Sequence, residues 1–251
     1  MDIRVGDYLE RIAVEAPVPV DAQGLRRLQR AHLFTVPFEN LDIHRGVPIE
    51  LDERAFLDKI VRRRRGGFCY ELNGAFAWLL GELGFPVRRL SANVFQRGDW
   101  GIDFDHMLLA VDLDRAWLAD VGFGDNYLDP LRWVEGRVQE QSVGDFRGDR
   151  SPPHGITLRA PSGGDRFEPQ YRFEDRAHAL ADFGPGCRYH QTPESHFSQG
   201  TVCSLARPDG RITLRSDRLI ETRDGQRRET AVAGEAEWRA LLAERFGIVL
   251  D

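Results

Sequence analysis

The stretch RRRRGGFCYELNGAFAWLL, from Arg62 to Leu80, predicts the helix around which the first third of the chain folds. Apolar residues recur at helical spacing at Leu72, Phe76, Leu79 and Leu80 and, just beyond the stretch, at Leu83. Counting back along these positions places Cys69 on the same inward face, in the first turn. Gly84 and Pro86 follow as helix-ending signals. We therefore expect a helix that begins near Cys69 and carries a thiol at its N-terminus.

Two interpretations of this thiol are open. A cysteine on an apolar helix face is commonly a buried structural residue. A helix N-terminus, however, offers unpaired N–H groups and the positive end of the helix dipole, which favour a thiolate over a thiol. Gly66 and Gly67 also leave the backbone before Cys69 without side chains, so that a substrate can approach closely.

A nucleophilic thiol needs a base, and the base needs an orienting acceptor. Among the seven histidines, His106 opens a predicted strand, HMLLAV, and the next strand, WLADVGFG, contains Asp120. A buried carboxylate must be paired. In an even-sum antiparallel register the two side chains share one face, whereas a slip of one residue separates them. The alternative is a satisfied strand-end histidine and a loop acid.

Outside this segment the pattern predicts helices first and strands later. Asp21 and Asp52 are candidate caps of two helices. The segment QSVGDFRGDRSPPHG, residues 141–155, is expected to be a loop. Pro208-Asp209-Gly210 predicts a hairpin, and EAEWRALLAERFGI predicts a closing helix. From Val87 the short strands of a small antiparallel barrel or sandwich are predicted at VRRLSANVF, HMLLAVDL, AWLADVGF, GITLRA and YRFED.

Composition narrows the functional classes. The 251 residues carry a formal net charge of -6, which argues against a nucleic-acid partner. No apolar run approaches the roughly 18 residues of a membrane span, and the start lacks the apolar core of a signal peptide. Cys69, Cys187 and Cys203 show no C-x-x-C spacing, so neither a disulfide framework nor a zinc site is predicted. We expect a soluble cytosolic protein with reduced thiols and no metal or membrane partner.

Three motifs, RGGFCYELNGAF, DHMLLAV and WLADVGFG, resemble in their order and intervals the arylamine N-acetyltransferases. PFENLDIH, PESHF and VCSLA match the same family. The resemblance implies an α+β fold with a cysteine-proteinase-like core. It implies a helical bundle over residues 1–84 with the nucleophile, an antiparallel β-barrel over 85–185 with base and acid, and an α/β lid over 186–251.

The family's functional residues carry over by motif. The resemblance implies Cys69 as nucleophile, His106 as base and Asp120 as the residue that orients the imidazole. It implies a buried ion pair between Glu39 and Arg64, with a solvated cationic face as the alternative for at least two of the arginines at 62–65.

The resemblance also implies contacts to two substrates. The expected amine-pocket residues are Phe123, Tyr127 and Phe197, and the expected coenzyme A contacts are Ile102, Asp103 and Tyr189. The sequence departs from the family near YHQTPESHF, where Glu194 and His196 replace small hydroxyl residues. An acid at Glu194 does not favour phosphates.

The implied chemistry is acetyl transfer from acetyl-CoA to an arylamine or arylhydrazine through an S-acetyl-cysteine, without metal or redox cofactor. Three rivals remain. The order cysteine, histidine, aspartate also occurs in transglutaminase-like and papain-like hydrolases, which release acyl groups to water or lysine. An amide-forming acyltransferase of secondary metabolism is the second rival, and a catalytically inactive binding module is the third. The sequence predicts no oligomeric state.

Overall fold

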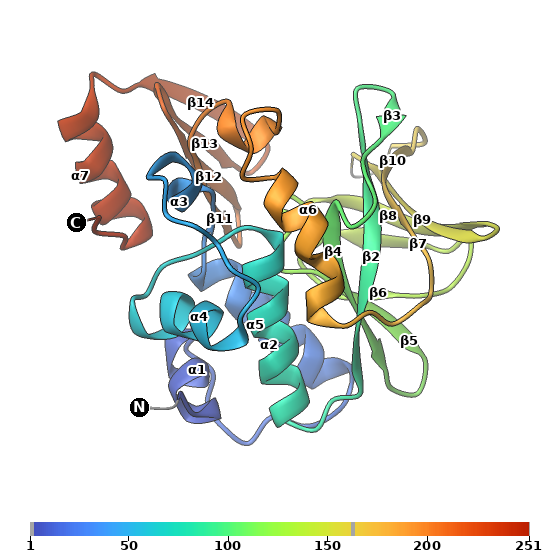
Figure 1. Ribbon diagram of the computed structural model, residues 1–251. Coiled ribbons are helices and arrows are strands. Elements are labelled where there is room, and N and C mark those ends of the chain that lie inside the picture. Colours follow the sequence, from blue (N-terminus) through green and yellow to red (C-terminus); the bar gives the residue numbers. More distant parts are fainter. Residues whose placement is uncertain (1–2, 162–163, 251) are drawn as a thin grey trace.

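The computed structural model describes residues 3–161 and 164–250, which form a helical region, a barrel of antiparallel strands and a smaller sheet covered by a helix (Figure 1). Within these residues no helix is long and apolar enough to cross a membrane. The helices are α1 (Val5–Arg11), α2 (Ala22–Thr35), α3 (Leu41–His44), α4 (Glu53–Leu57), the π-helix η1 (Asp58–Arg62), α5 (Cys69–Glu82), the short 3-10 helices η2 (Leu180–Phe183) and η3 (His196–Ser198), α6 (Gly184–Tyr189) and α7 (Glu235–Phe246).

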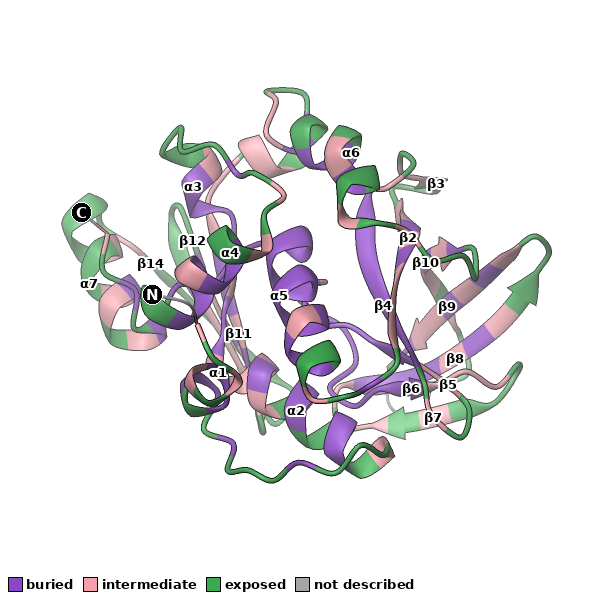
Figure 2. Ribbon diagram, turned by 60° about the horizontal axis from the view of Figure 1, so that its bottom comes forward, coloured by how far each residue is buried: buried purple, intermediate pink, exposed green. Residues whose placement is uncertain are grey.

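The helix predicted from Cys69 is present as α5, and it lies at the centre of the molecule (Figure 2). Eleven of its 14 residues are buried, since α4 and α1 pack on one side and strand β4 of the barrel on another. The predicted caps are also confirmed. The Asp21 side chain accepts a hydrogen bond from Gly24 N–H, and the Asp52 side chain accepts one from Ala55 N–H.

The barrel follows α5 directly. Its strands are β2 (Val87–Gln96), β3 (Asp99–Trp100), β4 (His106–Asp112), β5 (Ala116–Ala119), β6 (Leu131–Arg132), β7 (Val138–Gln141), β8 (Gly144–Ser151), β9 (His154–Ala160) and β10 (Glu168–Phe173). The order is β6-β5-β4-β2-β10-β9-β8-β7, with β3 paired to β2. The end strands meet through a side chain, because the Gln139 amide bonds both the N–H and the C=O of Arg132. The barrel is thereby nearly closed.

The loop predicted over residues 141–155 is wrong. Residues 144–151 form β8, which pairs with β7 on one side and β9 on the other. Phe146 is fully buried in the barrel and anchors this strand. Pairing on both edges outweighs the turn-forming composition of this segment, because strand propensity depends strongly on neighbours.

The C-terminal sheet has the order β1-β11-β12-β13-β14. Its strands are β1 (Phe38–Glu39), β11 (Val202–Arg207), β12 (Gly210–Arg215), β13 (Arg218–Arg223) and β14 (Gln226–Ala231). The predicted hairpin is confirmed, since Arg207 pairs with Gly210. One face of the sheet packs on α7, burying Cys203, Ile212, Leu214 and Leu219 against Leu242 and Phe246. The other face is turned toward the barrel.

His32 is an unusual member of the helical core. It is fully buried between Tyr8 and Phe76, and within the described residues neither ring nitrogen has a hydrogen-bond partner. Burial, aided by Arg11, lowers the pKa of His32 to about 3. Because the unfolded chain binds this proton more readily, folding stability decreases as the pH falls below about 6.5.

We expect this histidine to contribute about 2 kcal/mol of destabilisation at pH 5 relative to pH 7. The variant His32→Leu should lose that part of the acid dependence, as measured by urea unfolding at both pH values. The matched control His44→Gln, at an exposed histidine, should behave like the parent protein. Equal acid sensitivity of the parent and His32→Leu would contradict this assignment.

Candidate active site

The Cys69 thiol sits at the first residue of α5 and lines a cavity of about 730 Å³. The loop before it is held by backbone pairing with β1. Phe38 forms a parallel bridge with Gly67, and Glu39 N–H donates to Gly67 O over 2.9 Å. Cys69 is only 3% exposed. The cavity lies between the N-terminus of α5, the barrel and the C-terminal sheet.

His106 and Asp120 form a buried pair, and His106 lines the cavity that Cys69 also lines. His106 Nε2 lies 2.9 Å from Asp120 Oδ2. Leu109 pairs with Ala119, so the register places Asp120 opposite Leu108 and diagonal to His106. The predicted same-face arrangement is therefore confirmed. The carboxylate engages Nε2 and so fixes the orientation of the ring at the cavity.

Asn73 connects the helix to both strands, and sequence reasoning missed it. It lies one turn after Cys69 on the same face of α5. Its Nδ2 donates to Met107 O over 2.7 Å and to Asp120 Oδ1 over 2.9 Å. Its Oδ1 accepts from Val121 N–H over 2.9 Å. An asparagine on an otherwise apolar helix face was the available signal, because a buried amide needs partners.

Gly122 allows the loop that carries Asp120 to rest on the backbone of Cys69. Its N–H donates to Asp120 Oδ1 over 2.9 Å. A Cβ added to Gly122 would lie 2.8 Å from Cys69 Cα and 3.0 Å from Cys69 O. Any larger residue would therefore push the Asp120 loop away from α5.

Burial raises the pKa of the Cys69 thiol well above its usual value. A hydrogen bond from the Met107 backbone lowers it, and the nearby acids, including Asp105 and Asp120, raise it. The helix terminus alone therefore does not account for an ionised sulfur. A reactive thiolate here would require a base that takes the proton, and His106 lines the same cavity.

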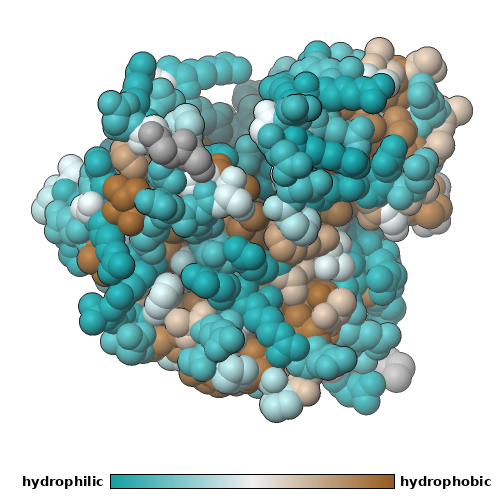
Figure 3. All heavy atoms as spheres, turned by 180° about the vertical axis from the view of Figure 1, so that it is seen from behind, coloured by the Kyte–Doolittle hydropathy of each residue, from teal (hydrophilic) through white to brown (hydrophobic). Residues whose placement is uncertain are grey.

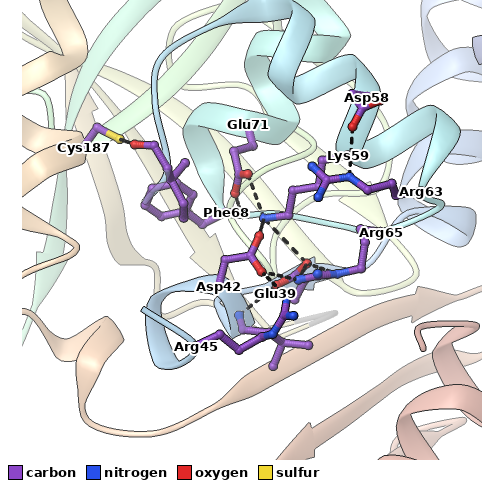
Figure 4. A network of polar contacts seen from close by, with 12 residues as sticks. Glu39, Asp42, Arg45, Asp58, Lys59, Arg63, Arg65, Phe68, Glu71 and Cys187 are labelled. Carbon is purple, nitrogen blue, oxygen red and sulfur yellow. Dashed lines mark hydrogen bonds and ion pairs between the residues drawn. The ribbon is translucent and has the colours of Figure 1, made fainter. Parts of the chain in front are cut away.

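A buried network of charges supports the loop before Cys69 (Figure 4). Lys59, the only lysine in the sequence, lies 2.8 Å from both Asp42 Oδ2 and Glu71 Oε1 and 3.8 Å from Glu39. Glu71 Oε2 accepts from Phe68 N–H over 3.1 Å, at the N-cap of α5. Burial alone lowers the pKa of Lys59, but the three carboxylates raise it above its usual value.

The expected pair of Glu39 with Arg64 is wrong, and Arg65 takes that place. Arg65 Nη2 lies 2.7 Å from Glu39 Oε1 and 3.1 Å from Asp42 Oδ1. Arg64 has a φ of 51°, so the chain turns there and its side chain is exposed. The solvated alternative holds for the exposed neighbours, which are Arg62, Arg63 and Arg64.

The expected substrate contacts divide into two groups. Phe123 and Phe197 line the cavity, and the Phe123 ring lies edge-on to His106 at 5.3 Å between centroids. Tyr127 does not line it. The chain turns inward after Phe123, and Tyr127 is fully buried, with its hydroxyl 2.8 Å from Tyr171. Tyr171 in turn contacts both His106 and Phe123.

The residues expected at the coenzyme are also outside the cavity lining. Ile102, Asp103 and Tyr189 are exposed, whereas His196 does line the cavity. Among the described residues no group of three or more histidine, cysteine, aspartate or glutamate side chains is placed to hold a metal ion.

Comparison with known proteins identifies the family. A family model described as N-acetyltransferase matches residues 21–251. The arylamine N-acetyltransferase of Mycolicibacterium smegmatis is 35% identical over 261 residues, which cover 100% of this chain and 94% of that protein. The chain belongs to the arylamine N-acetyltransferase family.

Solved structures of the family share the fold. The arylamine N-acetyltransferase of Salmonella typhimurium superposes with a TM-score of 0.92 at 30% identity, covering 97% of this chain and 90% of that one. The enzyme of Mycobacterium marinum in complex with CoA gives 0.89 at 32% identity, covering 98% and 93%. The predicted α+β fold is thereby confirmed.

Replacing Lys59 should destabilise the protein strongly, because it leaves buried carboxylates without their cation. We expect Lys59→Met to lower the free energy of unfolding by about 3–5 kcal/mol. Lys59→Arg should restore little, because a planar guanidinium cannot replace a compact ammonium among three carboxylates. Chemical denaturation measures both. The control Arg63→Met, at an exposed ion pair with Asp58, should cost less than about 1 kcal/mol.

Removing the Asn73 amide should both destabilise the fold and disturb the thiol. Asn73→Ala removes the side-chain partner of Met107 O and of Val121 N–H and one of two donors to Asp120 Oδ1, so we expect a loss of about 3 kcal/mol in the free energy of unfolding. Alkylation of Cys69 by iodoacetamide near neutral pH should also slow. The control Asn93→Ala, at a half-buried amide that bonds the 101–103 loop, should leave the alkylation rate unchanged. An unchanged rate in Asn73→Ala would contradict the positioning role.

Proposed function

We propose that this protein transfers an acetyl group from acetyl-CoA to an arylamine or arylhydrazine by a ping-pong mechanism through S-acetyl-Cys69. The observation that carries the proposal is the buried His106–Asp120 pair, 2.9 Å apart, at the cavity lined by Cys69. A structural relative that binds CoA supports the choice of donor. The family assignment supports the choice of acceptor.

In the first half-reaction, the Cys69 sulfur attacks the thioester carbonyl while its proton passes to His106 Nδ1. The new C–S bond forms, the old one breaks, and the departing thiolate takes the proton from the imidazolium. Asp120 holds Nε2–H and stabilises the positive charge that develops on the ring. Exchange between two thioesters is nearly balanced in energy, so a thiol nucleophile suits this step.

In the second half-reaction, the amine nitrogen attacks the acyl carbon of S-acetyl-Cys69. His106 accepts the proton from nitrogen and returns it to the sulfur as the C–S bond breaks. Phe123, Phe197 and Phe38 supply apolar walls for a flat aromatic ring. Because Phe123 lies against His106, a ring bound on Phe123 brings its amine close to the base.

Intact-protein mass spectrometry tests the proposal. Mixing with acetyl-CoA should add the mass of one acetyl group to the parent protein and to Cys187→Ala and Cys203→Ala, but not to Cys69→Ala. Adding 4-methoxyaniline should remove the adduct and yield the acetylated amine.

His106→Gln should slow adduct formation by about a hundredfold or more, because general-base catalysis contributes that much. An adduct on Cys187 or Cys203 would overturn the assignment of the nucleophile. Release of free acetate at the same rate with and without the amine would identify a hydrolase instead.

A further inference from the structure

The face of the C-terminal sheet that is turned toward the barrel forms one wall of the cavity. Figure 3 shows hydrophilic residues on the C-terminal lobe where a hollow separates it from the barrel. Because strand side chains alternate, this face is distinct from the apolar one under α7. The sheet residues on the cavity are Val202, Ser204, Arg211, Thr213, Arg215, Arg218, Ile220, Thr222, Arg227 and Glu229.

Strand register arranges these side chains in rows that begin at the nucleophile's loop. The central row crosses the sheet from the Gly67 bridge through Phe38, Ser204, Thr213, Ile220 and Glu229. Its middle residues are small or uncharged. On one side Arg215 is paired with Val202, and Arg218 follows across the next turn. On the other side Arg211, Thr222 and Arg227 form a parallel row. The result is a neutral floor between two cationic sides.

The two sides differ in how far their charges are already compensated. Arg211 lies 3.3 Å from Asp125, and its side chain is only 16% exposed. Arg227 is paired with Glu229. Arg211 is therefore largely committed to an acid of the protein, whereas the Arg227 side chain stays 62% exposed beside Glu229.

The opposite side is more open. Arg218 lies 3.4 Å from Asp217 and 3.8 Å from Glu229, but its side chain is 46% exposed, and such pairs contribute little. Among the described residues no ion pair involves the Arg215 side chain. The cavity lining holds four guanidinium groups, all on this sheet, and three carboxylates, Asp105, Asp125 and Glu229, of which only Glu229 is on the sheet, so the sheet wall retains a net positive charge.

We propose that this face binds the phosphate groups of the acyl donor, with Arg215 and Arg218 as the principal ligands. The inference rests on the proposed function, since it requires an acyl-CoA donor at Cys69. It replaces the expected contacts at Ile102, Asp103 and Tyr189, which lie outside the cavity lining.

The distances fit such a donor. Neighbouring strands lie about 4.8 Å apart, so β12 and β13 are roughly 10 and 14 Å from β1, which pairs with the loop before Cys69. The pantetheine arm between the thioester and the first phosphate is about as long as four extended residues, or roughly 14 Å. A donor whose thioester lies at Cys69 therefore carries its phosphates to the level of Arg215 and Arg218.

The double variant Arg215→Gln/Arg218→Gln tests the proposal by half-reaction kinetics. We expect kcat/KM for acetyl-CoA to fall by about tenfold or more, because charge-assisted hydrogen bonds are lost. The rate with p-nitrophenyl acetate, an acyl donor without phosphates, should stay within about twofold of the parent rate. The kcat/KM for the arylamine should also be unchanged, because in a ping-pong reaction it reports only the second half-reaction. Added salt should inhibit the acetyl-CoA reaction of the parent more than that of the variant.

Arg228→Gln is the matched control, because Arg228 lies on β14 between Arg227 and Glu229 and so faces away from the cavity. It should keep the parent kcat/KM for acetyl-CoA. An equal loss in Arg228→Gln, or an equal loss with p-nitrophenyl acetate, would overturn the proposal. A fall in kcat/KM for the amine alone would assign the face to an anionic acceptor and overturn it as well. If the parent protein forms no acetyl adduct with acetyl-CoA, the proposed function fails too, whereas an unaffected double variant refutes only the phosphate site.

Discussion

The side-chain amide of Asn73 is the interaction on which the candidate site depends. The thiol, the imidazole and the carboxylate come from a helix and two strand ends, and Asn73 bonds the helix to both strand segments at Met107, Asp120 and Val121. These bonds lie in a dry interior, where they are strong if all are made and costly if one is missing. The Asn73 bonds therefore fix the position of α5 against the barrel.

The charge network around Lys59 holds the loop before Cys69 in position, as Asn73 holds α5 in position. Taking five charged groups out of water is expensive, and an apolar cluster of the same size is often at least as stable. What the network supplies is direction, since Glu71 holds the Phe68 N–H while Arg65 and Lys59 hold Glu39. The buried charges therefore position the loop before Cys69 more than they stabilise the fold.

Sequence patterns predicted the parts of this arrangement that follow from the regular spacing of residues in helices and strands. The register of His106 and Asp120 follows from the alternation along two strands joined by a short turn, and the face of Cys69 follows from helical spacing. Arg65 and Tyr127 were missed because a single backbone turn reverses the direction of a side chain. Arg64 has a positive φ, and Tyr127 follows a turn after Phe123 that no periodic pattern marks. The strand β8 was missed because its residues are typical of turns, whereas its stability comes from pairing with β7 on one edge and β9 on the other.

In the proposed mechanism, the burial of Cys69 would favour acyl transfer over hydrolysis. Burial raises the pKa of the thiol, which works against the nucleophile in its resting state. The same burial keeps bulk water away from an acyl group on the sulfur, and the rings of Phe123 and Phe197 narrow the approach further. A flat amine can displace the remaining water by contact with those rings, whereas a water molecule gains little there. If the proposed mechanism holds, the burial that makes the sulfur costly to ionise, a cost that His106 and Asp120 would offset, also lengthens the lifetime of the acyl enzyme.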